Sequence, residues 1–175
     1  MQGPGRKREE ALAGSRYLRE PRPLHFPSEE VVPKNRRHMM LRSALFQMIA
    51  LALRGKAAIG SDQFVYWNAR DPNRRLAPDV FVCMRLADFV FDSWKTWEYE
   101  APDLAVEIVR ATDAGRGEWQ RKLDRYHPAG IQELAMFDPA SPEGTRLRVW
   151  DRVEGDLVER PTEGTGRRVL CCAGW

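Results

Sequence analysis

Hydrophobic residues recur every three or four positions between residues 34 and 53, which is the spacing of one face of an α-helix. Gly55 follows, and a glycine just beyond such a stretch is typical of a helix end. The pattern therefore predicts a helix over 34–53. The positions expected on its buried face are Met40, Leu41, Ala44, Leu45, Met48, Ile49 and Ala52.

Shorter hydrophobic runs after this helix predict strands. Residues 103–110 are hydrophobic on both alternating faces, which predicts a strand that is buried on both sides. The segment IQELAMFDP predicts another strand, and RLRVWDRVEGDLVERP predicts a hairpin that turns at Glu154 and Gly155. The earlier strands are expected at about 57–59, 63–67 and 80–84, with a turn in NARDPNRR.

The segment TDAGRGEWQRKLDRYHPAG predicts a second helix, which Pro128 and Gly130 would end. Trp119, Leu123 and Tyr126 share one face of that helix, and Lys122 borders this face. The order of helix, strands, helix, strand and hairpin predicts an α/β fold, in which a mixed central sheet is flanked by helices.

Two carboxylates stand out against these hydrophobic strands. Glu107 lies in the middle of the strand 103–110, where an unpaired charge is costly. Asp79 comes directly before another hydrophobic strand. Each has an ordinary structural explanation, since Pro-Asp is common turn chemistry and Glu107 could be paired with an arginine. Lys122 could simply extend along Trp119.

Together these residues favour a more economical interpretation. Two carboxylates from separate strands can hold Mg²⁺, which prefers oxygen ligands. The metal would activate a water and screen a phosphate, while Lys122 would stabilise charge on the attacked phosphorus. A cation would also explain why Glu107 is tolerated inside a strand.

The overall composition is that of a protein with one globular domain. The chain has 175 residues and a formal net charge of +3. Residues 1–30 are polar, basic and interrupted by three prolines, so we expect a flexible tail there and a single domain over 31–175. No hydrophobic run approaches the roughly 20 residues that span a bilayer. The N-terminus lacks the hydrophobic core of a secretory signal, so we expect a cytoplasmic protein without membrane association.

An ordered set of short motifs resembles the Uma-two family of endonucleases, within the PD-(D/E)xK restriction-endonuclease-like superfamily. The set comprises APDVFV, APDLAVEIV, a helix with KLDRY, and AGIQELAMFDP, and it spans about residues 33–160. The resemblance implies a restriction-endonuclease-like core. It also implies that Asp79 and Glu107 are metal ligands, with the Ile108 carbonyl as a third, and that Lys122 is the catalytic lysine, moved from strand to helix.

The resemblance implies a Mg²⁺-dependent DNA endonuclease, with Mn²⁺ as a substitute, that hydrolyses phosphodiester bonds. The basic N-terminal region and the arginines Arg74, Arg75, Arg110 and Arg116 would contact backbone phosphates.

The sequence departs from the family pattern at Lys34, where an acid is expected, and in RATD after the glutamate strand. A nuclease fold that binds nucleic acid or protein without catalysis is therefore the alternative, followed by a structural domain with salt-bridged carboxylates. The oligomeric state, including a homodimer, stays open.

Overall fold

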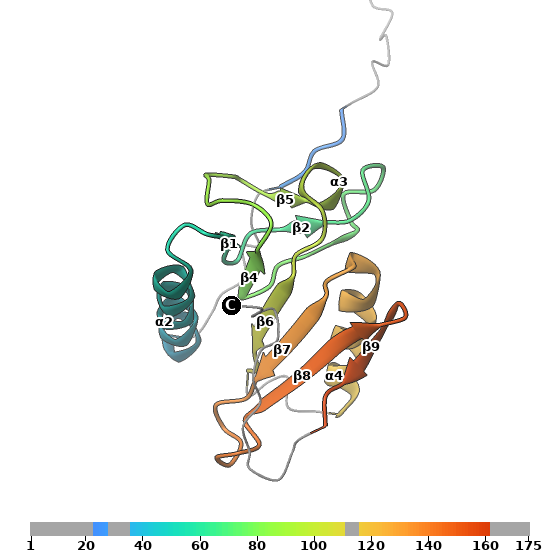
Figure 1. The fold of residues 1–175 in the computed structure, drawn as a ribbon. Coiled ribbons are helices and arrows are strands. Elements are labelled where there is room, and N and C mark those ends of the chain that lie inside the picture. Colours follow the sequence, from blue (N-terminus) through green and yellow to red (C-terminus); the bar gives the residue numbers. More distant parts are fainter. Residues whose placement is uncertain (1–22, 28–35, 111–115, 162–175) are drawn as a thin grey trace, which may run out of the picture.

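The computed structural model describes residues 23–27, 36–110 and 116–161. Its main sheet has six strands in the order β1-β4-β6-β7-β8-β9 (Figure 1). Only β6 and β7 are parallel among these neighbours, so the sheet is mixed. The strands are β1 Ala58–Gly60, β4 Val80–Cys83, β6 Leu104–Ile108, β7 Glu133–Phe137, β8 Leu147–Val153 and β9 Asp156–Glu159.

Two helices cover opposite faces of this sheet. Helix α2, Arg36–Leu53, lies on one face, and helix α4, Arg116–Tyr126, lies on the other (Figure 1). Helix α4 connects the parallel pair β6 and β7, as a parallel connection requires. It continues into a short 3-10 helix, His127–Ala129, and ends at Gly130, whose φ of +76° is a conformation that favours glycine.

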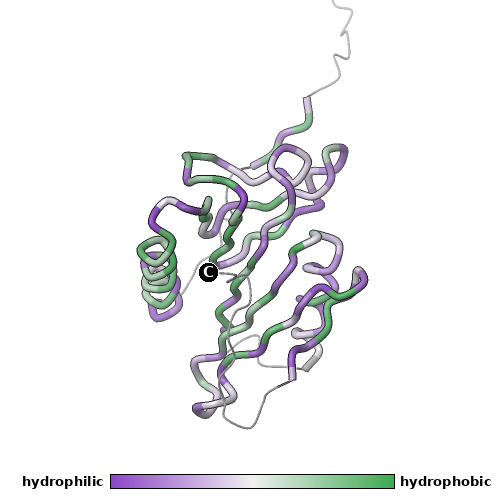
Figure 2. The backbone as a smooth tube through the Cα atoms, viewed as in Figure 1, coloured by the Kyte–Doolittle hydropathy of each residue, from purple (hydrophilic) through white to green (hydrophobic). Residues whose placement is uncertain are grey.

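Alternation along the strands builds a hydrophobic core on each side. Val80, Val82, Leu104 and Val106 meet α2, and their sequence neighbours Phe81 and Ala105 belong to the core that includes Tyr126 of α4. Figure 2 shows the hydrophobic positions running through these central strands. A strand that contributes to both cores is hydrophobic on both faces, as the sequence of 103–110 predicted.

A second, three-stranded sheet extends the core on the α4 side. Its order is β3-β2-β5, and β2 pairs with β5 in parallel. The short helix α3 follows β5 directly in the chain. Trp94 of β5 is fully buried and lies edge-on against Phe81 of the main sheet. The elements are β2 Val65–Tyr66, β3 Arg75–Leu76, β5 Trp94–Lys95 and α3 Thr96–Tyr99.

The predicted fold class is confirmed, since the central sheet is mixed and helices flank both of its faces. The predicted face of the first helix is wrong in part. Met40 and Met48 are 57% and 69% exposed, and Ala44 and Ala52 are exposed as well, whereas Phe46 and Leu53 contact the sheet. Hydrophobic residues lie on both sides of α2, so the side chains available on the sheet decide which side is buried.

The predicted tail 1–30 falls largely outside the described residues, as do Lys34 and residues 111–113. Of the part that is described, Phe26 lies edge-on against Tyr66, whose hydroxyl donates a hydrogen bond to the Pro27 carbonyl at 2.6 Å. Within the described ranges, the longest helices are too short or too polar to form a transmembrane segment.

Candidate functional site

The pairing of β4 with β6 brings the two predicted carboxylates together. Val80 is opposite Val106 in this antiparallel pair. The residue before Val80 is therefore opposite the residue after Val106, which puts Asp79 opposite Glu107. Directly opposed residues point to the same face of a sheet, with Cβ atoms about 4.5–5.5 Å apart. Residues 28 positions apart in the chain thus meet at the start of β4, on the side of the sheet that α4 covers.

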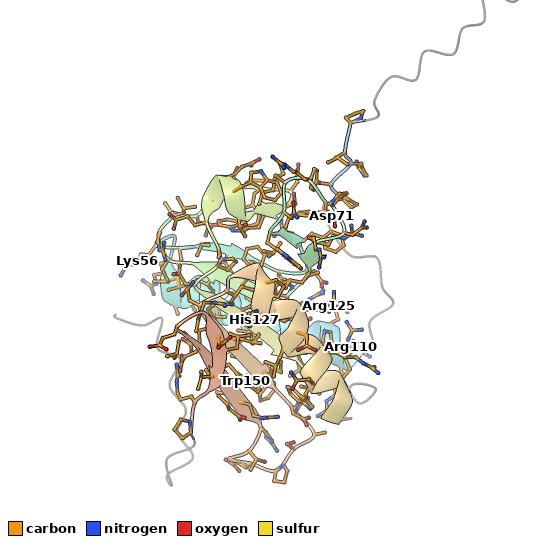
Figure 3. The ribbon with its side chains drawn as sticks, turned by 90° about the vertical axis from the view of Figure 1, so that its right-hand side faces the viewer. Lys56, Asp71, Arg110, Arg125, His127 and Trp150 are labelled. Atoms are coloured by element: carbon orange, nitrogen blue, oxygen red, sulfur yellow. The ribbon has the colours of Figure 1, made fainter. Side chains whose placement is uncertain are left out.

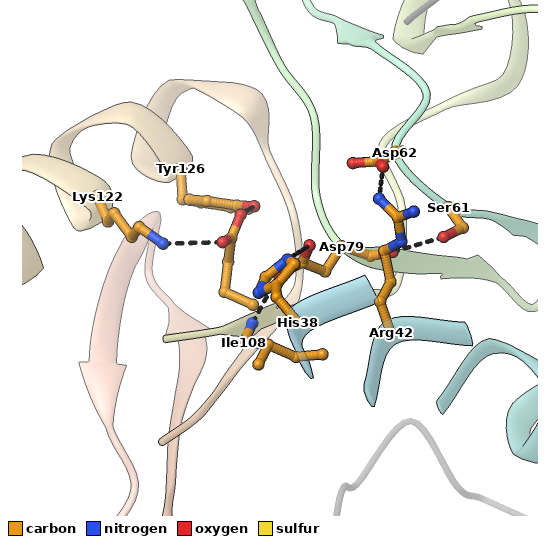
Figure 4. Close-up of polar contacts among 9 residues, drawn as sticks. His38, Arg42, Ser61, Asp62, Asp79, Ile108, Lys122 and Tyr126 are labelled. Carbon is orange, nitrogen blue, oxygen red and sulfur yellow. Dashed lines mark hydrogen bonds and ion pairs between the residues drawn. The ribbon is translucent and has the colours of Figure 1, made fainter. Parts of the chain in front are cut away.

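Groups from α2, from β6 and from the segment after β1 hold Asp79 in place (Figure 4). Its Oδ1 lies 2.7 Å from Nε2 of His38 on α2, and its Oδ2 accepts a hydrogen bond of 2.8 Å from the Ile108 N–H. The Ser61 hydroxyl donates to the Asp79 carbonyl at 2.8 Å. Asp79 and His38 are both almost fully buried, so these contacts define one orientation of the carboxylate.

Glu107 is held from the opposite side by α4. Lys122 Nζ lies 2.9 Å from Glu107 Oε2, and the Tyr126 hydroxyl donates a hydrogen bond to Oε1. Burial raises the pKa of Glu107; the Lys122 ammonium lowers it, and the nearby Asp79 carboxylate raises it again. Burial also raises the pKa of Tyr126, and the Glu107 carboxylate adds to that effect. The Tyr126 hydroxyl therefore stays a neutral donor to Glu107.

The helical geometry of α4 explains why Lys122 reaches the carboxylate. Lys122 and Tyr126 are four residues apart, so they lie on the same side of the helix, one turn apart. Tyr126 is buried and Lys122 is partly buried, whereas Arg121 and Arg125 are exposed. This agrees with the sequence-based prediction that Lys122 borders the hydrophobic face.

The structure adds two residues to the predicted set. Tyr126 was expected only in the hydrophobic face, although its place one turn from Lys122 could have indicated a shared partner. His38 was not among the predicted site residues. Its contact with Asp79 spans 41 positions, and no local pattern indicates it.

The donor set suits a hard divalent cation. Carboxylate oxygens are the ligands that Mg²⁺ prefers, and each can accept about two bonds. Each oxygen of Glu107 has one described partner, which leaves room for a cation. Across residues 23–27, 36–110 and 116–161, no three His, Cys, Asp or Glu side chains group closely enough to hold a metal by themselves. A cation here would therefore need water or carbonyl ligands as well. That the Ile108 carbonyl is one of them stays a prediction.

Comparison with known proteins gives two results. The Uma2 family model, described as "putative restriction endonuclease", matches residues 28–174. A crystal structure of "a putative nuclease belonging to DUF820" from Anabaena variabilis is similar, with 17% identity and a TM-score of 0.46. The match covers 70% of this chain and 65% of that one, so the chain spans slightly less than two thirds of that protein. No curated protein matches.

Proposed function

The chain belongs to the Uma2 family, and from that premise we propose that it is a divalent-cation-dependent DNA endonuclease. The observation that carries the proposal is the meeting of Asp79, Glu107 and Lys122 at the start of β4. Two carboxylates with an adjacent ammonium are the groups that phosphodiester hydrolysis needs.

The protein's own side chains would divide the work as follows. Mg²⁺ or Mn²⁺ held by Asp79 and Glu107, with the Ile108 carbonyl as the expected third oxygen, would supply an activated water and positive charge at the phosphate. Lys122 would place its ammonium beside the negative charge that develops on the attacked phosphate. Its position 2.9 Å from Glu107 supports this role.

His38 and Tyr126 would position the carboxylates rather than touch the substrate. His38 fixes one oxygen of Asp79, and Tyr126 fixes one oxygen of Glu107. A catalytic group must be held close to its productive geometry by supporting hydrogen bonds. Because His38 comes from α2 and Tyr126 from α4, the site depends on helices from both faces of the sheet.

A second candidate function is nucleic-acid binding without catalysis. The observation that favours it is the contact between Glu107 and Lys122, because the ammonium already compensates the carboxylate without a cation. In this case Asp79, Glu107 and Lys122 would be a structural network, and the domain would bind DNA through its basic surface alone.

Cleavage of supercoiled plasmid in Mg²⁺ or Mn²⁺ tests the choice. We expect nicked and linear products from the wild-type protein and none in EDTA. Lys122→Ala should reduce cleavage at least a hundredfold. Lys95→Ala is the matched control, because Lys95 of β5 pairs with Glu98 of α3, and this variant should leave cleavage unchanged.

A failure of the wild-type protein to cleave in either metal would refute the enzymatic proposal and favour the binding function. Equal cleavage by Lys122→Ala and the wild type would instead refute the role of the lysine. Testing both metals guards against a site that accepts only one of them.

A further inference from the structure

A cleft of about 100 Å³ opens beside the Asp79 site, between the start of α2 and the segments that follow β6 and β7. It shares two residues with that site, since His38 and Ile108 line it and both contact Asp79. Two arginines also line it, Arg37 from the first turn of α2 and Arg110 from the end of β6. Arg110 is labelled in Figure 3, in the view that looks onto α4.

Neither of these arginines serves an evident structural purpose. Among the described residues, no ion pair or hydrogen bond engages the guanidinium of Arg37 or of Arg110. Most other arginines of the fold are engaged: Arg148 with Glu159, Arg160 with Asp151, and Arg85 with Glu100. Cations in the first turn of a helix are also unfavourable, because they face the positive end of the helix dipole. Helix stability therefore does not account for Arg37.

The acidic residue of the cleft offsets only part of their positive charge, and its oxygens are bonded to groups other than the arginines. Asp138 Oδ1 accepts the N–H of Ala140 at 2.9 Å, and Oδ2 accepts the Ser141 hydroxyl at 2.8 Å. Its carboxylate thus closes the turn after β7. With two arginines against one aspartate, the cleft keeps an excess positive charge next to the carboxylate pair.

We propose that this cleft binds a backbone phosphate of the DNA strand next to the one that would be cleaved. A guanidinium presents planar N–H donors that match phosphate oxygens, and such contacts position a strand without reading its sequence. The cleft has room for a phosphate group. The inference rests on the proposed function for its ligand, and it names the residues that would orient the strand.

The structure also separates these arginines from others that the sequence suggested. Arg74 lies 3.6 Å from Asp71, and Arg75 donates to the Pro72 carbonyl and lies over the ring of Phe64. Both belong to the region of the small sheet, and neither lines the cleft. The side chain of Arg116 lies outside the described residues.

Salt-dependent binding of a labelled 20-base-pair duplex by the full chain, in EDTA to prevent cleavage, tests the proposal. The slope of log K against log[salt] is negative, and each lost phosphate contact should reduce its magnitude by about 0.9. Because both arginines would contact the same phosphate, we expect part of that decrease for Arg37→Ala or Arg110→Ala alone and the full decrease of about 0.9 for the double variant. Arg70→Ala is the matched control, because it removes the same charge from the turn between β2 and β3. It should leave the slope unchanged.

An unchanged slope in the double variant, an equal decrease in Arg70→Ala, or no duplex binding by the wild type would each overturn the cleft assignment. Plasmid cleavage in Mg²⁺, run in parallel, separates the two proposals. If the wild type cleaves while the double variant keeps its slope, the cleft is wrong and the nuclease stands. If the magnitude of the slope falls while the wild type does not cleave, the cleft stands and the nuclease is wrong.

Discussion

Replacing Asp79 by alanine and by asparagine should separate its structural role from its proposed chemical role. Asp79 is 3% exposed and accepts hydrogen bonds from the Ile108 N–H and at the His38 ring. Alanine removes the acceptor that the Ile108 N–H and the His38 ring share, and the loss of each buried hydrogen bond costs about 1–3 kcal/mol. The expected loss for Asp79→Ala is therefore about 2–6 kcal/mol.

Asparagine has nearly the same shape and can satisfy both partners. Its carbonyl oxygen can accept the Ile108 N–H, and its amide can donate to a neutral His38 ring. The free energy of unfolding of Asp79→Asn should therefore stay within about 1 kcal/mol of the wild type. Both variants remove the negative charge, so both should abolish metal-induced stabilisation and plasmid cleavage.

Thermal unfolding in EDTA and urea titration measure the stability difference. For a domain of this size, each kcal/mol changes Tm by about 2–4 °C, so Asp79→Ala should melt on the order of 5–20 °C below the wild type. Equal stability of the two variants would refute the assignment of these hydrogen bonds. Metal-dependent cleavage by Asp79→Asn would refute the proposed role of the carboxylate.

Three further predictions address the metal, the pH dependence and the packing. Mg²⁺ or Mn²⁺ at a hundredfold excess over Kd should stabilise the wild type by about 2.7 kcal/mol, measured as a rise in Tm on thermal unfolding. Lys122→Ala should show the same rise in Tm. No rise in the wild type would count against a metal site. Because burial raises the pKa of Glu107 above 4.5, its protonated form stabilises the fold fully below that pH, and this contribution is lost as pH rises through the folded pKa. Glu107→Gln should remove that part of the pH dependence in urea unfolding with EDTA between pH 4.5 and 8, and the idea fails if the dependence persists. Gly60→Ala should destabilise the fold by about 1–3 kcal/mol, because the added Cβ would lie 2.1 Å from the Phe81 ring. Gly117→Ala on α4 should stabilise it by up to about 1 kcal/mol, because its Cβ would meet nothing within 4 Å. The same urea assay compares the two variants, and equal stabilities would contradict the packing.

Periodicity predicted the long elements because it records which faces of an element are buried. Residues 103–110 are hydrophobic on both faces, and the structure gives β6 a hydrophobic core on each side. The spacing on α4 likewise predicted that Lys122 lies at the border of the buried face. Two-residue strands such as β3 and β5 are too short to leave such a record, and neither was predicted.

The sequence also selected the carboxylates that meet. Asp79 before a hydrophobic strand and Glu107 inside one are unusual positions for charges, and this made both visible without a structure. Their opposition across β4 and β6 depends on register, which no local pattern contains.

Tertiary structure alone decided how the site is completed. Helix α2 is hydrophobic on two sides, and packing against the sheet buries the side with Phe46 and Leu53 rather than the side with Met48. That choice brings His38 to Asp79 and Arg37 to the cleft with Arg110. Contacts between residues more than 40 positions apart depend on how helices and strands are arranged in space, so the sequence by itself determined the elements and the charges, and only the packing determined their partners.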